Sequence, residues 1–237
     1  MNFTVMGLWS EMGIVARAVV IVLLGMSMYS LAIAVERLLA FRRARVASAQ
    51  AAALLASIID QGAKIESAVG IDQKFPHSPV ARVAGAGVAE FGKALGPASA
   101  HPGAGDYDIV DAVVRAMERI RERELANLRR GLPVLATVSS SAPFVGLFGT
   151  VGGIITAFQK LADPAKGGGG IGTVSAGIAE ALVTTAVGLG VAIIAVWFFN
   201  FFNARIEQLT VDMDETASEL VDVVIKDGRS KRSASTS

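Results

Sequence analysis

Three long stretches of the chain contain almost no charged residues, and each is long enough to cross a lipid bilayer as a helix. Residues 18–35 are all uncharged, and 18 residues at about 1.5 Å of rise per residue nearly span a hydrocarbon core of about 30 Å. Residues 131–159 are also uncharged, and residues 167–204 carry a single charge, that of Glu180. We therefore predict transmembrane helices over residues 18–38, 132–160 and 172–200.

The third stretch is longer than a bilayer requires, so we expect the helix to continue into water from Asn200 onward. Apolar residues recur at helical spacing between Ile206 and Ile225, which predicts an amphipathic helix within residues 201–237. The last ten residues are rich in Ser, Lys and Arg, and this composition predicts a disordered tail.

The segment between the first two apolar stretches, residues 39–131, is predicted to form a helical domain. Its apolar residues are spaced three or four apart and do not alternate, which favours helices over strands. Gly96-Pro97 and the Pro- and Gly-containing residues 101–105 interrupt the pattern. The predicted fold class is therefore an all-α membrane protein with three transmembrane helices and long helices that extend into the cytoplasm.

The strongest helical signal in this segment follows the second interruption. Asp106 or Asp108 can cap a helix whose apolar positions keep a spacing of three or four as far as Leu132, so that it runs into the second apolar stretch. The opposite face carries Arg and Glu side chains, among them Arg121 and Glu124. We expect this face to be solvated and held by ion pairs within the helix, and a dedicated binding patch is the alternative.

The distribution of Lys and Arg predicts the orientation of the chain, because positive side chains are retained on the cytoplasmic side. Residues 36–131 contain 14 of the 22 Lys and Arg, and residues 204–237 contain five. The N-terminus is therefore predicted to be periplasmic and the C-terminus cytoplasmic. The predicted external segments are residues 1–17 and 161–171, and the predicted cytoplasmic segments are residues 39–131 and 201–237.

A cleaved signal peptide is the alternative interpretation of the first stretch, because Ala32-Ile33-Ala34 resembles a small-residue cleavage site. The apolar run is long for a signal, and the segment before it contains Glu11 and one basic residue. Arg37, Arg42, Arg43 and Arg45 follow it directly, and such a cluster resists export. A retained helix is favoured, with these arginines in contact with anionic lipid.

The composition excludes several functional classes. The chain is 52% hydrophobic and 18% charged, has no Cys and contains only two His, so thiolate nucleophiles and Cys- or His-rich metal sites lack the residues they need. A net charge of +1 gives no global basicity for a nucleic-acid partner. The glycines at 167–170 predict a flexible connection, because no Lys-Ser/Thr pair follows them as in a phosphate-binding loop. We expect neither an enzyme nor a bound cofactor or metal.

Glu180 is the residue most suited to carry chemistry. A carboxylate at membrane depth costs about 2.5–3.5 kcal/mol on insertion scales, so its side chain should face the protein interior or a hydrated pore. A carboxyl group withdrawn from water can take up and release a proton near neutral pH. The alternative is a permanently neutral Glu that hydrogen-bonds a neighbouring helix.

Small and polar residues form a stripe on each of the last two membrane helices. In the third stretch the stripe contains the acidic residue at steps of three or four: Thr173, Gly177, Glu180, Thr184 and Gly188. The second stretch repeats the arrangement with Ser139, Pro143, Gly146, Thr150, Gly153 and Ala157. The two stripes can line an ion pathway, or they can pack the helices closely together, and both roles are compatible. Pro143 is expected to kink its helix.

Residues 141–154 (SAPFVGLFGTVGGI) and 176–189 (AGIAEALVTTAVGL) resemble the two signature stretches of the MotA/TolQ/ExbB proton-channel family. Within that family the chain looks like an ExbB or TolQ subunit, and its three spans with an outside N-terminus match the family layout. By this resemblance the ion pathway contains Thr150, Glu180 and Thr185, and Thr184 is an additional hydroxyl. Gly152 departs from the Trp that ExbB- and TolQ-like members usually have, which leaves the subfamily open.

The resemblance also implies the assembly. Family members form a ring in the bacterial inner membrane, typically a homopentamer, around two copies of a single-span ExbD- or TolR-like partner that carries a membrane aspartate. Proton flow drives motion that is passed to a TonB- or TolA-like effector or to a gliding or motility machinery. Whether the ion is a proton or sodium, and which effector receives the work, stays open.

Two other functions compete with an ion-driven motor subunit. A non-conducting scaffold would use the stripes only to pack helices and Glu180 only to anchor the single-span partner. A secondary transporter would show internal repeats, and the chain has no convincing repeat and few spans for alternating access.

Overall fold

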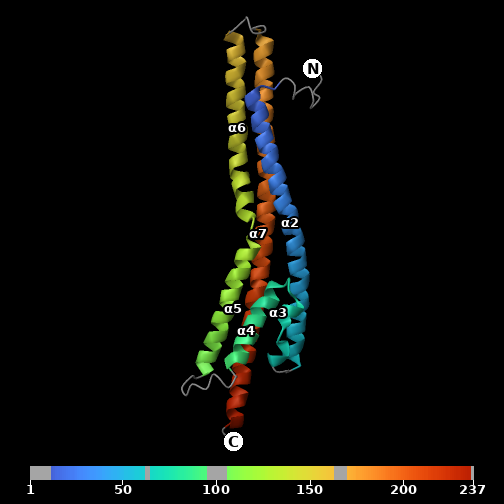
Figure 1. Cartoon of the computed structure of the whole chain (residues 1–237), viewed down its shortest axis with the longest axis vertical. Coiled ribbons are helices and arrows are strands. Elements are labelled where there is room, and N and C mark those ends of the chain that lie inside the picture. The colour runs from blue at the N-terminus through green and yellow to red at the C-terminus, as the bar shows by residue number, and fades with distance from the viewer. Residues whose placement is uncertain (1–11, 62–64, 95–105, 163–169, 236–237) are drawn as a thin grey trace. The chain divides into compact units, whose positions relative to one another are not determined.

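The computed structural model describes residues 12–61, 65–94, 106–162 and 170–235, and every secondary-structure element in these ranges is a helix (Figure 1). The described residues fall into two compact units. Unit one comprises Met1–Arg37 and Gly131–Phe202, and unit two comprises Leu38–Arg130 and Asn203–Ser237. The elements are α2 (Ile14–Asp60), a 3₁₀ helix (Ile65–Ala68), α3 (Ile71–Lys74), α4 (Pro79–Ala94), α5 (Asp106–Leu128), α6 (Leu132–Ala162) and α7 (Ile171–Ser235). The predicted all-α fold class is confirmed.

Unit one contains the apolar parts of α2, α6 and α7, and these three helices are each long and apolar enough to cross a membrane. The chain is therefore a multi-pass membrane protein, as its sequence predicts. The interior of the unit is small: Val19 and Leu23 of α2 pack with Val138 and Ala142 of α6 and with Ala195 of α7. Large apolar side chains such as those of Phe144, Phe148 and Trp197 are more than 60% exposed, as suits contact with lipid or with other subunits.

Unit two has a core of its own, built where α4 packs against α5. Val80, Val83 and Phe91 of α4 are almost fully buried against Val113 and Met117 of α5. Leu220 and Val224 of α7 and Leu55 of α2 complete the same cluster. Gly87 of α4 lies where these helices are closest, because a Cβ atom there would come 2.7 Å from the Met117 sulfur and 2.8 Å from a Leu220 methyl carbon.

The start of α4 is fixed by Ser78, which the sequence places directly before Pro79. The Ser78 hydroxyl accepts a hydrogen bond from the Ala81 backbone N–H at 3.0 Å and lies 3.1 Å from the Ser48 hydroxyl of α2. Both serines are buried, so this pair satisfies polar groups that would otherwise lack partners. Ser at the N-cap followed by Pro at the first helical position is a preferred helix start.

The charged face of α5 differs from its prediction, because two of its side chains pair with other helices. Glu124 is 7% exposed and accepts two hydrogen bonds from Arg82 of α4, at 2.7 and 2.8 Å. Arg121 donates two hydrogen bonds to Asp214 of α7, and this hydrogen bonding raises the pKa of Arg121. These ion pairs join α4, α5 and α7 within unit two, so the face is only partly the solvated surface that its composition indicates.

Two boundaries also differ from the predictions. The helix expected to run from Asp106 or Asp108 through Leu132 ends at Leu128, and Gly131 has a φ of 84°, a conformation that favours glycine. The last ten residues, expected to be disordered, continue as helix to Ser235, since extending an established helix costs far less than starting one. Residues 236–237, like residues 1–11 of the predicted external segment and Gly167–Gly169, lie outside the described residues.

We predict that Glu124→Ala destabilises the protein by about 1–3 kcal/mol, because the change removes the buried partner of a two-bond ion pair. Arg82 is 38% exposed and regains some hydration, which limits the effect. The matched control is Glu90→Ala on α4, which breaks the exposed pair between Glu90 and Lys93 and should change stability by no more than about 0.5 kcal/mol. Chemical unfolding followed by circular dichroism measures both, and equal effects would contradict this assignment.

Candidate ion-transfer site

The two stripes of small residues pack face to face between α6 and α7 in unit one. A Cβ atom on Gly188 would come 2.7 Å from the carbonyl oxygen of Ala142, and one on Gly146 would come 2.9 Å from the carbonyl oxygen of Thr184. Further along the helices, a Cβ on Gly153 would lie 2.9 Å from the Ala181 methyl group. A Cβ on Gly177 would come still closer to the Ala157 methyl group, at 2.6 Å. These glycines therefore allow backbone contact between the helices, which is the packing role considered for them.

The close contact brings three threonine hydroxyls together. Thr184 is fully buried, and its Oγ1 lies 2.7 Å from the carbonyl oxygen of Ala181 in its own helix and 3.1 Å from that of Gly146 in α6. The Thr150 and Thr185 hydroxyls hydrogen-bond each other across the two helices. Thr150 Oγ1 is also 3.3 Å from the carbonyl oxygens of both Gly146 and Ala181. Because a hydroxyl both donates and accepts, this cluster can rearrange its hydrogen bonds without moving its helices.

Glu180 is half-buried, and its partner comes from α2. Its Oε1 accepts a hydrogen bond of 2.6 Å from the backbone N–H of Gly13. The Gly13 carbonyl oxygen accepts the N–H of Arg17 at 3.0 Å, which makes Gly13 the N-cap residue of α2. Glu180 therefore lies at the N-terminus of α2, where the backbone N–H groups carry a partial positive charge. One oxygen of the carboxyl group thus has a partner within the protein, as expected for an acid in an apolar helix.

The structure places the predicted site residues in two groups. Thr150, Thr184 and Thr185 form the hydroxyl cluster, whereas the hydrogen bonds of the described residues do not join Glu180 to any of them. Glu180 precedes Thr184 by one helical turn on α7, so the two groups are neighbours along the helix and remain separate in hydrogen bonding.

Two other predicted residues belong to α6 and lie outside both groups. The Ser139 hydroxyl donates to the carbonyl oxygen of Ala136 within α6, at 2.8 Å. Pro143 lies inside α6, and the kink expected there stays a prediction. The side chain of Thr173 is outside the described residues.

Reasoning from the sequence missed Gly13, Gly149 and Ala181. Gly13 directly precedes an apolar run, and a glycine in this position is a usable N-cap signal, but nothing local links it to a carboxylate 167 residues away. A Cβ on Gly149 would come 2.6 Å from Thr184 Oγ1, so Gly149 makes room for that hydroxyl. Ala181 supplies a carbonyl oxygen that two of the threonines approach.

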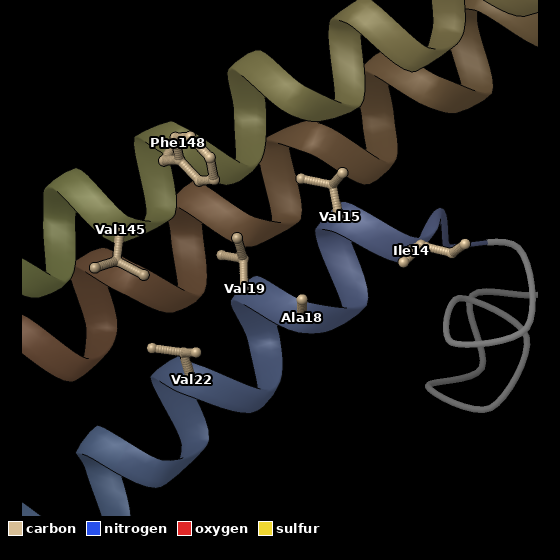
Figure 2. A pocket seen from close by; sticks show the side chains of 7 residues that line it. All are labelled: Ile14, Val15, Ala18, Val19, Val22, Val145 and Phe148. Atoms are coloured by element: carbon tan, nitrogen blue, oxygen red, sulfur yellow. The ribbon is translucent and has the colours of Figure 1, made fainter.

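An apolar groove of about 430 Å³ lies beside this site, between α2 and α6 (Figure 2). It is lined by Ile14, Val15, Ala18, Val19, Val22, Val145 and Phe148. This lining offers an ion no polar group that could replace its hydration shell. The described residues also contain no group of three His, Asp or Glu that could hold a metal ion.

Comparison with known proteins finds a matching family and similar bacterial sequences. Residues 77–215, more than half of the chain, match the model of the MotA/TolQ/ExbB proton channel family. The chain is 43% identical over 134 residues to the Tol-Pal system protein TolQ of Pseudomonas aeruginosa, which covers 56% of this chain and 55% of the relative.

Two biopolymer transport proteins named ExbB are also similar. That of Xanthomonas campestris pv. campestris is 44% identical over 110 residues, which is 46% of this chain and 43% of the relative. That of Neisseria gonorrhoeae is 46% identical over 90 residues, which is 38% of this chain and 40% of the relative. The chain thus matches about half the length of these relatives.

We predict that Gly188→Ala destabilises unit one by about 1–3 kcal/mol, because the new methyl group would meet backbone atoms that cannot move aside. Gly190→Ala is the matched control on the same helix, since nothing lies within 4 Å of its Cβ position, and it should be neutral or stabilise by up to about 1 kcal/mol. Thermal unfolding in detergent distinguishes the two. A tolerated Gly188→Ala would show that α6 and α7 are not in backbone contact.

Proposed function

Because the chain belongs to the MotA/TolQ/ExbB proton channel family, we propose that it is a subunit of an inner-membrane complex that converts proton flow into mechanical work on envelope partners. Similarity to TolQ and to ExbB supports a Tol-Pal or TonB type of energy-transducing complex. A charge that crosses 100 mV releases about 2.3 kcal/mol, so several protons per step supply useful work.

The observation that carries the proposal is the position of Glu180. It is an acid in an apolar segment of α7, half-buried, and held by the end of another membrane helix. We assign it the role of ion-carrying carboxylate. Thr184, one helical turn from Glu180, and the hydroxyl pair of Thr150 and Thr185 are assigned to the same pathway, because their hydroxyls can pass a proton or coordinate a small cation.

The complete pathway requires more than one chain. Glu180 is the only ionisable residue within residues 167–204, and residues 131–159 have none. Exposed apolar side chains on α6 and α7, such as Phe144, Leu147 and Leu182, are available for contacts between subunits. We propose a homo-oligomeric ring, a pentamer by family resemblance, around two copies of a single-span ExbD- or TolR-like partner whose membrane aspartate exchanges the ion with Glu180.

The glycines of the two stripes serve the same pathway indirectly. Gly146, Gly153, Gly177 and Gly188 bring α6 and α7 into contact and so hold the hydroxyl cluster together. We place the N-terminus in the periplasm and the C-terminus in the cytoplasm, on the distribution of Lys and Arg. A TonB- or TolA-like effector, or a motility machinery, would receive the work.

A non-conducting scaffold is the competing function, because backbone packing accounts for the glycines without any ion flow. It does not account for the presence of an acid in an apolar segment, because an amide side chain at the same position could make the same hydrogen bond. Gln in place of Glu180 would accept the same bond from Gly13 without the cost of a charge. The two functions therefore differ in what they predict for that substitution.

We predict that Glu180→Gln lowers proton flux to the level of protein-free liposomes while leaving the assembly intact, because Gln keeps the shape and hydrogen bonding of Glu but cannot release a proton. The complex, purified with its copurifying single-span partner, is reconstituted in liposomes, and flux is followed with a pH-sensitive dye under an imposed potential. Size-exclusion chromatography reports the assembly.

The matched control is Glu207→Gln, the same change at an exposed position of α7 in unit two, which should conduct like the unmodified complex. Unchanged flux in Glu180→Gln would overturn the channel proposal and favour the scaffold.

A further inference from the structure

The amide of Gly13 is the hydrogen-bond donor that holds Glu180, and its setting makes it a strong one. The first N–H groups of a helix lack partners within the helix, and together they carry a partial positive charge. Gly13 has no side chain that could cap α2 by itself, so the carboxylate of Glu180 supplies the missing acceptor from α7. Among the hydrogen bonds of the described residues, Glu180 takes part only in this one, through Oε1.

The approach of α2 to this site depends on Gly152 of α6. A Cβ atom on Gly152 would come 2.6 Å from Cγ1 of Val15, which is in the first turn of α2 and two residues from Gly13. Figure 2 shows Val15 and Val19 on the side of α2 that faces the other two helices. Val is stiff about its Cα–Cβ bond in a helix, so its methyl group cannot easily turn away. The absence of a side chain at Gly152 therefore lets the first turn of α2 lie close to α6 and α7.

From these two contacts we propose that Gly13 is a positioning residue for the ion-carrying carboxylate. We further propose that Gly152, because it leaves room for Val15, allows α2 to hold Gly13 beside Glu180. This inference rests on the proposed function and deepens it. The N–H of Gly13 holds Glu180 while the carboxylate is ionised, because hydrogen bonds to an ionised acceptor are about twice as strong as those between neutral groups. When Glu180 takes up its ion the bond weakens, and the side chain is released toward the next acceptor. The first turn of α2 thus acts as a latch, which means that it binds the Glu180 side chain only while no ion is bound to the carboxylate.

The chain provides a matched pair of variants at the latch itself. Gly13→Pro removes the N–H donor, whereas Gly13→Ala keeps it, and a Cβ at this position meets Glu180 Oε1 and Thr156 Cγ2 only at ordinary contact distances of 3.8 and 3.9 Å. In the complete complex we expect the proton flux of Gly13→Pro to be about tenfold lower than that of Gly13→Ala.

An infrared signature of Glu180 gives a readout that a merely structural role would not move. In complexes labelled with ¹³C-glutamate, the difference between the unmodified protein and Glu180→Gln identifies the carboxylate band. Loss of a hydrogen bond should shift that band in Gly13→Pro and leave it in place in Gly13→Ala. An unshifted band in Gly13→Pro, or a shifted band with unchanged flux, would overturn the proposal.

A second pair of variants tests the role of Gly152. This pair also tests the proposal if Gly13→Pro fails to assemble. Gly152→Ala should displace Val15, shift the same infrared band and lower the flux several-fold. Adding Val15→Ala removes the Cγ1 atom at 2.6 Å and leaves the Cβ at 3.4 Å, so the double variant should recover both readouts. Failure of this rescue, with Val15→Ala alone behaving normally, would contradict the role of Gly152.

The latch and the proposed function can fail separately. Loss of flux in Glu180→Gln together with normal flux in Gly13→Pro and Gly152→Ala would contradict the latch and leave the proposed function standing.

Discussion

A carboxylate in a membrane-crossing helix must find its partners within the protein, and this constraint organises unit one. Lipid offers no hydrogen bonds, so an acid such as Glu180 is tolerated only where another part of the protein stabilises it. The backbone N–H of Gly13 does so at 2.6 Å, at the end of α2 where the helix dipole is positive. This contact between α2 and the acid is the basis of the latch proposed above.

Close contact between α6 and α7 is the second condition for the site. Gly146 and Gly188 bring the two backbones together, and this contact places Thr150 beside Thr185 and Thr184 beside the Gly146 carbonyl oxygen. Packing and ion transfer are thus compatible uses of the same small residues. A helix pair separated by larger side chains would leave these hydroxyls too far apart to bond.

Most of the fold was predictable because it depends on patterns that are local in the sequence. Uncharged runs give the three membrane helices, and apolar residues at helical spacing give α4 and α5. The sequence also singles out Glu180 as an acid in an apolar segment, whereas Thr150, Thr184 and Thr185 were identified from the small-residue stripes and the family resemblance. What it could not predict depends on contacts between distant residues, such as the bond from Gly13 to Glu180 and the burial of Glu124 against Arg82. The end of α5 was missed because Gly131 adopts a positive φ that spacing does not reveal.

Whether Glu180 carries the ion within the assembled complex can be decided from the surroundings of its side chain in that complex. Electron cryomicroscopy of the complex in lipid, with its single-span partner bound, would locate the side chain. If Glu180 carries the ion, it lies against the first turn of α2 in at least one subunit and faces water or a partner carboxylate in another. Glu180 directed at lipid acyl chains in every subunit, away from water and from any partner acid, would contradict it.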